Sequence, residues 1–229
     1  MKIGGLHKVS LIDYPEAICA VVFLQGCNFK CSYCHNPQLV EPKLFDPCLD
    51  EKKVLEFLAA RIGKLDAVTI TGGEPTIQKD LLPLIMKIKK LGFAVKLDSN
   101  GTQPKIIKEL LDAKLLDFIA MDIKAPLEKY KSIVKVTVDT QSIEESIKLI
   151  LKSKIPHEFR TTVVKAQLTE KDILKIAKLI SGAKRYALQK FVPAKTLDKK
   201  FLKEKTYLDD ELESIKIRLE KEIPSVIVR

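Results

Sequence analysis

Three cysteines near the start of the chain, Cys27, Cys31 and Cys34, have the spacing C-x3-C-x2-C. Three thiolates on one short loop can hold an iron–sulfur cluster, but cubane clusters are normally bound by four cysteines. One iron atom would therefore be free to bind a different ligand. The rest of the chain must then supply a binding site for that ligand.

A structural zinc site and a set of inert thiols are the alternatives. Zinc usually takes four ligands from paired C-x2-C units. The chain has no second pair, and His35 follows Cys34 too closely to be a comfortable fourth ligand. We interpret Cys19 as a thiol packed in the core and Cys48 as an incidental thiol before a helix. These observations favour the iron–sulfur cluster.

The elements that must position these cysteines form a regular alternation. Short apolar runs alternate with amphipathic segments, which predicts parallel strands joined by helical crossovers. The predicted strands are residues 6–11, 17–24, 67–70, 94–97, 118–121, 159–164 and 186–192. The predicted helices are residues 50–62, with Asp50 as the cap, 79–91, 104–113, 143–152, 170–180 and 209–222, and a last segment, residues 225–228, completes the fold.

Six of these strands, counted from the run before the cysteines, begin strand–helix units. The sequence therefore predicts an α/β fold, a partial (βα)6 barrel of the TIM type that is open on one side. No interdomain linker is visible, so we expect residues 1–229 to form a single domain. Residues 37–50 contain three prolines and are expected to be irregular.

Polar and glycine-rich residues follow most of the predicted strands. In α/β proteins of this kind, ligands gather at the carboxyl ends of the strands. The cysteines follow the first strand, and residues 71–75, 98–101 and 122–124 follow the next three. We therefore expect them to meet at one rim of the sheet.

The glycines Gly72 and Gly73, followed by Glu74, are either a simple turn or a place where backbone approaches a ligand and binds an amino or carboxylate group. Asp98 and Asn100 suit sugar hydroxyls, although Asn-Gly is also an ordinary turn sequence.

Three charged residues are expected on the inner side of the barrel. Asp122 and Lys124 are two residues apart, so their side chains share one face. Such opposite charges either pair with each other or bind a ligand. Arg160, inside the fifth strand, carries the same two alternatives, as an ion-pair partner or as a clamp for a carboxylate.

Composition narrows the functional class. The chain has 229 residues, 46% of them hydrophobic, a net charge of +10, and only 6% aromatic residues. The N-terminal residues lack a signal sequence, and no apolar run is long enough to span a bilayer, so we expect a cytoplasmic protein. The lysine excess indicates a solvated surface or attraction to an acidic partner such as flavodoxin or ferredoxin, and nucleic-acid binding is not expected.

The cysteine triad and the Gly-Gly-Glu-Pro element after the second strand resemble the radical S-adenosylmethionine (SAM) superfamily over essentially the whole chain. The resemblance implies that a [4Fe-4S] cluster binds SAM through its vacant iron. One electron from the reduced cluster then cleaves SAM to a 5'-deoxyadenosyl radical. Within the superfamily, residues 10–15, 23–28 and 34–37 resemble activating enzymes of anaerobic ribonucleoside-triphosphate reductase. Those enzymes place a glycyl radical on a large partner protein.

The resemblance also implies roles for individual residues. Cys27, Cys31 and Cys34 would bind the cluster. Gly72, Gly73 and Glu74 would receive the SAM amino group, and Asp98 and Asn100 would lie near the ribose. Asp122, Lys124 and Arg160 would contact the ribose and the methionine carboxylate, and Tyr33 would lie near adenine. The resemblance to some activators further implies a monovalent cation, which Asp98 and Asp122 would share.

Some residues depart from the relatives' pattern. Glu16 stands where many of them have glycine. Residues 189–193 lack the histidine of pyruvate formate-lyase activators, which makes that partner a less favoured alternative. A radical SAM catalyst acting on a small molecule, such as a 7-carboxy-7-deazaguanine synthase, is a second alternative. An adaptor that binds zinc or a cluster without catalysis is a third.

Overall fold

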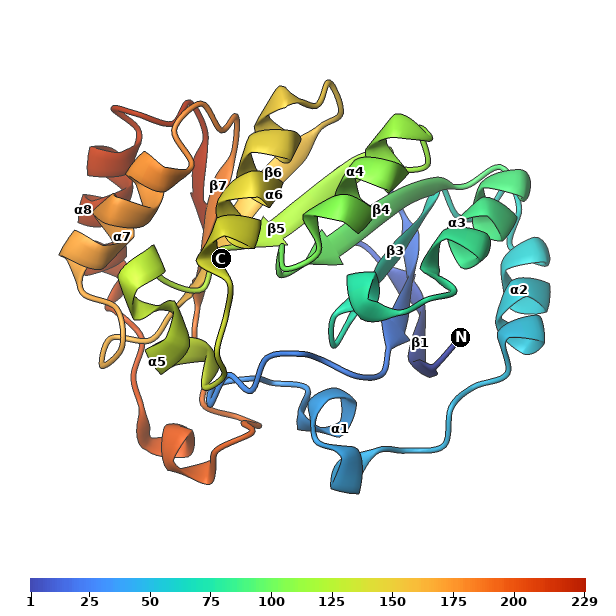
Figure 1. The fold of residues 1–229 in the computed structure, drawn as a ribbon, viewed down its shortest axis with the longest axis horizontal. Helices are drawn as coiled ribbons and strands as arrows, with labels where there is room; N and C mark the ends of the chain where they lie inside the picture. The colour runs from blue at the N-terminus through green and yellow to red at the C-terminus, as the bar shows by residue number, and fades with distance from the viewer.

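The computed structural model describes residues 1–229 and contains one eight-stranded sheet in the order β1 to β8 (Figure 1). β1 (Ile3–Ser10) pairs with β2 (Cys19–Leu24) in antiparallel orientation, and each later pair of neighbours is parallel. The remaining strands are β3 (Ala67–Gly72), β4 (Ala94–Ser99), β5 (Phe118–Asp122), β6 (His157–Val163), β7 (Tyr186–Lys190) and β8 (Val226–Val228). β1 and β8 do not pair with each other, so the predicted open α/β barrel is confirmed.

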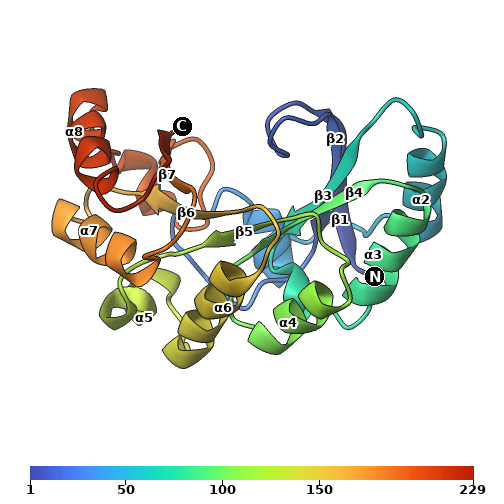
Figure 2. The ribbon, with the colours of Figure 1, turned by 90° about the horizontal axis from the view of Figure 1, so that it is seen from above.

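The long helices lie on the outer, convex side of this arc (Figure 2). Asp50 caps the first of them, as predicted, by accepting a hydrogen bond from the backbone N–H of Lys52 at 2.9 Å. None of the helices is long and apolar enough to cross a bilayer. The long helices are α2 (Glu51–Ala59), α3 (Leu81–Lys90), α4 (Pro104–Asp112), α6 (Thr140–Lys152), α7 (Glu170–Leu179) and α8 (Asp209–Leu219).

The sheet has one parallel strand more than the six that the sequence predicts. β8 pairs with β7 in parallel, with Tyr186 opposite Val226 and Leu188 opposite Val228. Its three residues are too few to show a period of two, so only the pairing with β7 defines it as a strand.

Several short helices lie in the connections. α1 (Pro37–Val40) and η1 (Pro42–Leu44) fall in the segment expected to be irregular, and η2 (Pro75–Ile77), η3 (Leu127–Lys129), α5 (Tyr130–Val134) and η4 (Lys199–Lys203) were not predicted. Single turns of helix leave no apolar period in a sequence, because they contain fewer residues than two turns. α1, α5 and the residues just before η4 form backbone hydrogen bonds with residues 26–34, which carry the three cysteines, so these connections shape the site.

Side chains alternate along each strand between the helices and the concave side of the sheet. On β6, Phe159 and Val163 belong to the hydrophobic core under the helices. Glu158, Arg160 and Thr162 face the concave side, where they line a cavity. The concave side is therefore charged, and ionised groups there need partners or ligands.

Candidate active site

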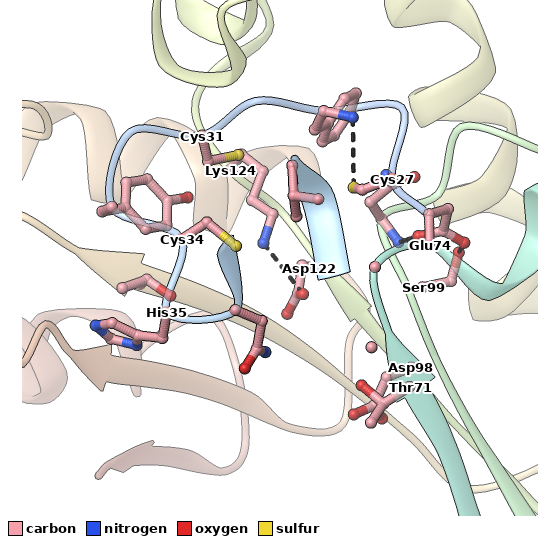
Figure 3. A pocket seen from close by; sticks show the side chains of 18 residues that line it. Cys27, Cys31, Cys34, His35, Thr71, Glu74, Asp98, Ser99, Asp122 and Lys124 are labelled. Atoms are coloured by element: carbon pink, nitrogen blue, oxygen red, sulfur yellow. Dashed lines mark hydrogen bonds and ion pairs between the residues drawn. The ribbon is translucent and has the colours of Figure 1, made fainter. Parts of the chain in front are cut away.

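The cysteine loop (residues 25–37) leaves β2 at the carboxyl edge of the sheet. Backbone hydrogen bonds hold it in place, from Gly26 N to Leu39 O at 2.8 Å and from Lys30 N to Val134 O at 2.9 Å. The side chains of Cys27, Cys31 and Cys34 point into one cavity of about 190 Å³ (Figure 3). The loop thus presents its three sulfur atoms to a common space.

The three thiols fit a cluster better than a single metal ion. No three Cys, His, Asp or Glu side chains converge closely enough to hold one ion, whereas in a cubane each cysteine binds a different iron. The cysteines form no disulfide. Burial raises the pKa of Cys27 to about 12 and that of Cys31 to about 11. A bound cluster would offset this cost, because its iron atoms bring positive charge to the thiolates.

Gly73 lets the segment after β3 lie directly against the cysteine loop. A Cβ atom at this position would be 1.9 Å from the carbonyl oxygen of Gly26. That oxygen instead accepts a hydrogen bond from Glu74 N at 2.8 Å, and Leu24 O accepts one from Gly73 N at 2.8 Å. Gly73 therefore allows two parts of the chain, the segment after β3 and the cysteine loop, to lie against each other and frame the cavity.

Gly72 has φ +120°, and a Cβ there would lie 2.4 Å from the backbone of Leu24. Both glycines of the motif are thus required by the packing of β3 against the strand that carries the cysteines.

Glu74 ties the end of β3 to the end of β4. Its side chain is buried and accepts hydrogen bonds from Thr76 N at 3.1 Å, Thr76 Oγ1 at 2.5 Å, Ser99 Oγ at 2.9 Å and Asn100 N at 2.6 Å. Burial raises the pKa of Glu74 in spite of these bonds. Most of its hydrogen-bonding capacity is used within the chain, so its role toward an amino group stays a prediction.

Asn28 is a site residue that the sequence reasoning missed. Its Oδ1 accepts a hydrogen bond from Asn100 Nδ2 at 2.8 Å, and its Nδ2 donates to Thr102 Oγ1 at 2.8 Å. Asn28 therefore fixes the amide of Asn100, which was predicted to lie near a ribose. Its place directly after Cys27 was the only signal in the sequence, since the pairing spans 72 residues.

Five charged side chains form an alternating series across β4, β5 and β6. Lys96 Nζ is 2.5 Å from Asp98 Oδ1, and Arg160 NH1 is 3.1 Å from Asp98 Oδ2. Arg160 Nε is 2.8 Å from Asp122 Oδ1, and Lys124 Nζ is 3.1 Å from Asp122 Oδ2. The ion pair between Asp122 and Lys124 is therefore formed, and Arg160 bridges the two aspartates.

These contacts decide the ionisation of the aspartates. Burial alone would raise the pKa of Asp122, but the charges of Arg160 and Lys124 outweigh it and hold that pKa well below its ordinary value. Arg160 and Lys96 likewise outweigh burial at Asp98 and lower its pKa. Both carboxylates are thus ionised, with Arg160 in the place where a monovalent cation would have to bind.

The cavity brings together all but one of the residues predicted for the SAM site. Tyr33 forms part of its wall, with a hydroxyl group that is buried and has no hydrogen-bond partner. Arg160 is the exception, because it faces a neighbouring cavity. The other predicted residues around the first cavity are Cys27, Cys31, Cys34, Gly72, Gly73, Glu74, Asp98, Asn100, Asp122 and Lys124.

The second cavity, of about 440 Å³, adjoins the first, and His35 and Thr162 line both. Glu158 lies in its wall on β6, two residues before Arg160. Side chains two residues apart on a strand share a face, so the expected inward position of Arg160 could have indicated that Glu158 also faces the concave side. Lys96 on β4, the third cation of the alternating series, is related to Asp98 in the same way.

A family model described as the Radical SAM superfamily matches residues 21–180, which is more than half of the chain. The chain belongs to the radical SAM superfamily. The match extends from β2, which carries the cysteine loop, to the end of α7. This radical SAM enzyme therefore has the family's cofactors, a [4Fe-4S] cluster and SAM. The three thiols, the polar wall of the cavity and the buried Tyr33 hydroxyl, which has no partner within the chain, fit both.

Relatives of known sequence and structure agree with this assignment. A protein of Methanocaldococcus jannaschii named as a glycyl-radical enzyme activating enzyme is 38% identical, over 99% of this chain and 95% of its own length. A 7-carboxy-7-deazaguanine synthase of Thermococcus kodakarensis is 27% identical over 77% of this chain and 76% of its own. The crystal structure of Streptococcus suis SuiB bound to S-adenosylmethionine has the same fold, with a TM-score of 0.69 at 14% identity. It matches 89% of this chain, which spans 48% of that protein.

Proposed function

We propose that this radical SAM enzyme activates a glycyl-radical enzyme, and that its partner is an anaerobic ribonucleoside-triphosphate reductase. When bound, a cluster held by Cys27, Cys31 and Cys34 and SAM in the cavity that these residues line would supply one-electron radical chemistry able to remove a hydrogen atom from a glycine of the partner. The 38% identical relative named as an activating enzyme supports the general role. The partner's identity rests on the motif resemblance in residues 10–15, 23–28 and 34–37.

The observation that carries this proposal is the open side of the barrel. A glycine in another protein can reach the SAM site only through an opening wide enough for a polypeptide segment. The second cavity lies on the concave side, adjoins the SAM site and is bordered by Ile12, Asp13 and Pro15 of the loop between β1 and β2. Leu11 and Ile12 of this loop are 72% and 85% exposed. Exposed apolar side chains beside a cavity suit a protein partner.

Glu158 offers this partner a specific contact. One carboxylate oxygen is 2.7 Å from Arg229 NH2, and the other is buried without any hydrogen-bond partner. A buried carboxylate oxygen without a donor costs free energy. An N–H group or a cationic side chain of the partner's segment would supply the missing donor, with some movement of Glu158.

The proposed site also includes two finer features. A monovalent cation between Asp98 and Asp122 would have to displace Arg160, which bonds to both. Replacing potassium by a larger organic cation should then weaken SAM binding if such a cation is present. The reductant is proposed to be a flavodoxin or a ferredoxin, which supplies the single electron.

Anaerobic co-incubation with a purified anaerobic ribonucleoside-triphosphate reductase, SAM and dithionite tests the function. A doublet electron-spin resonance signal on the partner is expected, together with 5'-deoxyadenosine. Cys31→Ala should lose both products and the bound iron, whereas Cys48→Ala, which removes an exposed thiol, should retain them. Cleavage of SAM without any signal on this partner would contradict the proposed partner.

A small-molecule radical SAM enzyme is the second candidate. The 27% identity to a 7-carboxy-7-deazaguanine synthase over 77% of the chain favours it. The second cavity is also within the usual volume range for small-molecule sites, about 300–1,000 Å³. Turnover of a carboxylated pterin by the reconstituted protein, with no radical on the reductase, would support this candidate over activation.

A further inference from the structure

A closed ring of hydrogen bonds joins the cysteine loop to the turn after β4. Asn100 Nδ2 donates to Asn28 Oδ1 at 2.8 Å, and Asn28 Nδ2 donates to Thr102 Oγ1 at 2.8 Å. The hydroxyl of Thr102 completes the ring by donating to Asn100 Oδ1 at 2.7 Å. Each of the three side chains thus donates one hydrogen bond and accepts one within the ring.

A backbone group sets the direction of this ring. Thr102 N, which can only donate, lies 3.1 Å from Asn100 Oδ1. Reversing the carboxamide of Asn100 would place its NH2 group against this N–H group, and two donors repel each other. That contact would be repulsive whichever way Asn28 is turned. Only one orientation of the Asn100 side chain therefore satisfies the network.

This orientation limits what Asn100 can offer to a ligand. Asn100 lines the first cavity, whereas Asn28 and Thr102 do not. Its carboxamide oxygen already accepts two hydrogen bonds, from Thr102 N and from Thr102 Oγ1. One N–H of its Nδ2 is used by Asn28, and the other has no partner within the chain. Asn100 can therefore act toward a ligand only as a hydrogen-bond donor.

Other contacts hold the backbone of the same turn. Glu74 Oε2 accepts a hydrogen bond from Asn100 N at 2.6 Å, and the buried Ser146 donates from Oγ to Gly101 O at 2.7 Å. Neither contact involves a member of the ring through its side chain. The backbone should therefore stay in place if the ring is opened, so the ring acts on the side chain of Asn100.

We infer that Asn28 and Thr102 are positioning residues for the nucleoside part of SAM, and that they act through Asn100. They hold its free N–H group ready to donate to a hydrogen-bond acceptor of the nucleoside. A side chain that is fixed in its binding orientation before the ligand arrives lowers the entropic cost of binding. This inference rests on the family's SAM cofactor and on none of the contacts proposed for the glycyl-radical partner.

The inference is tested by calorimetry on the anaerobically reconstituted protein with SAM, with 5'-deoxyadenosine as the nucleoside part alone, and with methionine. The test variant is Thr102→Val, which replaces the hydroxyl by a methyl group of similar size. Its matched control is Thr102→Ser, which keeps the hydroxyl and the ring. Thr102→Val should weaken the binding of SAM and of 5'-deoxyadenosine about threefold to tenfold, as for the loss of one net hydrogen bond, and Thr102→Ser much less.

Methionine should bind equally well to the wild type and to both variants, because its amino and carboxylate groups would bind the vacant iron. Equal loss of methionine and 5'-deoxyadenosine binding in Thr102→Val would overturn the inference, since the variant would then have damaged the whole site. Unchanged binding of 5'-deoxyadenosine in Thr102→Val would overturn it as well.

The double variant Asn28→Ala/Thr102→Val tests whether the two residues act as one ring. Because a ring can be opened only once, the double variant should bind 5'-deoxyadenosine about as tightly as Thr102→Val alone. Fully additive losses would contradict the ring, since Asn28 and Thr102 would then act separately. No partner protein is present in these measurements, so a missing glycyl radical on the reductase would leave them unaffected.

Discussion

The carbonyl oxygen of Gly26 occupies the space that any side chain at Gly73 would need, only 1.9 Å from the position of a Cβ atom. The glycine-rich segment after β3 and the cysteine loop are therefore fitted to each other before any ligand binds. Glu74 N, which donates to the same Gly26 oxygen at 2.8 Å, holds this contact in register. The same contact therefore fixes the position of Cys27 and that of the glycine-rich segment across the cavity from it.

Gly73→Ala should damage the site rather than only the local turn. The added Cβ forces apart two backbone segments, which we expect to destabilise the fold by about 2–3 kcal/mol. Iron content after anaerobic reconstitution should fall, because the cysteines are displaced. Gly5→Ala is the control, since its Cβ would meet the nearest atom at 3.7 Å, an ordinary contact. Full iron content in Gly73→Ala would refute this account.

Arg160→Met should destabilise the protein by about 3 kcal/mol, because it leaves two buried carboxylates with one cation each. In the native protein the pKa of Asp98 and of Asp122 lies below the unfolded value, so their contribution to stability is present above about pH 4 and is lost as the pH falls further. Without Arg160, burial raises both pKa values. The difference in unfolding free energy between the two proteins should therefore grow from pH 4 to pH 7.

Urea unfolding at several pH values measures this difference. The control Arg218→Met removes an exposed ion pair with Glu170 and should cost less than about 1 kcal/mol, with little pH dependence. A constant difference between wild type and Arg160→Met over this range would show that the two aspartates do not depend on Arg160.

Glu16→Gly should stabilise the protein. Glu16 has φ +62°, a left-handed conformation that costs a residue with a side chain about 1–2 kcal/mol. Glycine removes this cost, but its greater freedom in the unfolded chain destabilises the folded protein by about 0.4–1 kcal/mol. A net gain of about 0.5–1 kcal/mol in unfolding free energy is expected. Glu56→Gly, inside α2, should instead lose about 1 kcal/mol. Destabilisation by Glu16→Gly would mean that the turn is held by contacts of the glutamate.

His157 should make the free energy of unfolding decrease as the pH falls below about 6.5. Burial lowers the pKa of this imidazole below its ordinary value, and the nearby Lys184 adds to the shift, while Ile155 O opposes it. The unfolded chain therefore binds the proton first, so the stabilising contribution is complete above about pH 6.5 and decreases as the pH falls. His157→Gln should flatten the decrease in unfolding free energy between pH 7 and pH 5. Equal flattening by His7→Gln, which replaces an exposed histidine, would contradict this assignment.

Much of the fold could be predicted because local patterns carry it. Strand–helix alternation predicted β2 to β7, and Asp50 predicted the start of α2. Residues 225–228 were marked as a last segment but not counted among the strands, because the three residues of β8 show no period and only pairing with β7 orders them. α5 and η4 were also missed, since such short helices leave no apolar period, and it is α5 and the residues just before η4 that bond to the cysteine loop.

The sequence by itself determined the chemistry of this protein, because cysteine spacing and strand-end residues are local and chemically specific. Only the tertiary structure decided how these residues are used. It placed Arg160 between Asp98 and Asp122 and paired Asn28 with Asn100, both across more than thirty residues of chain. Such contacts depend on the curvature and register of the whole sheet, which no local pattern encodes.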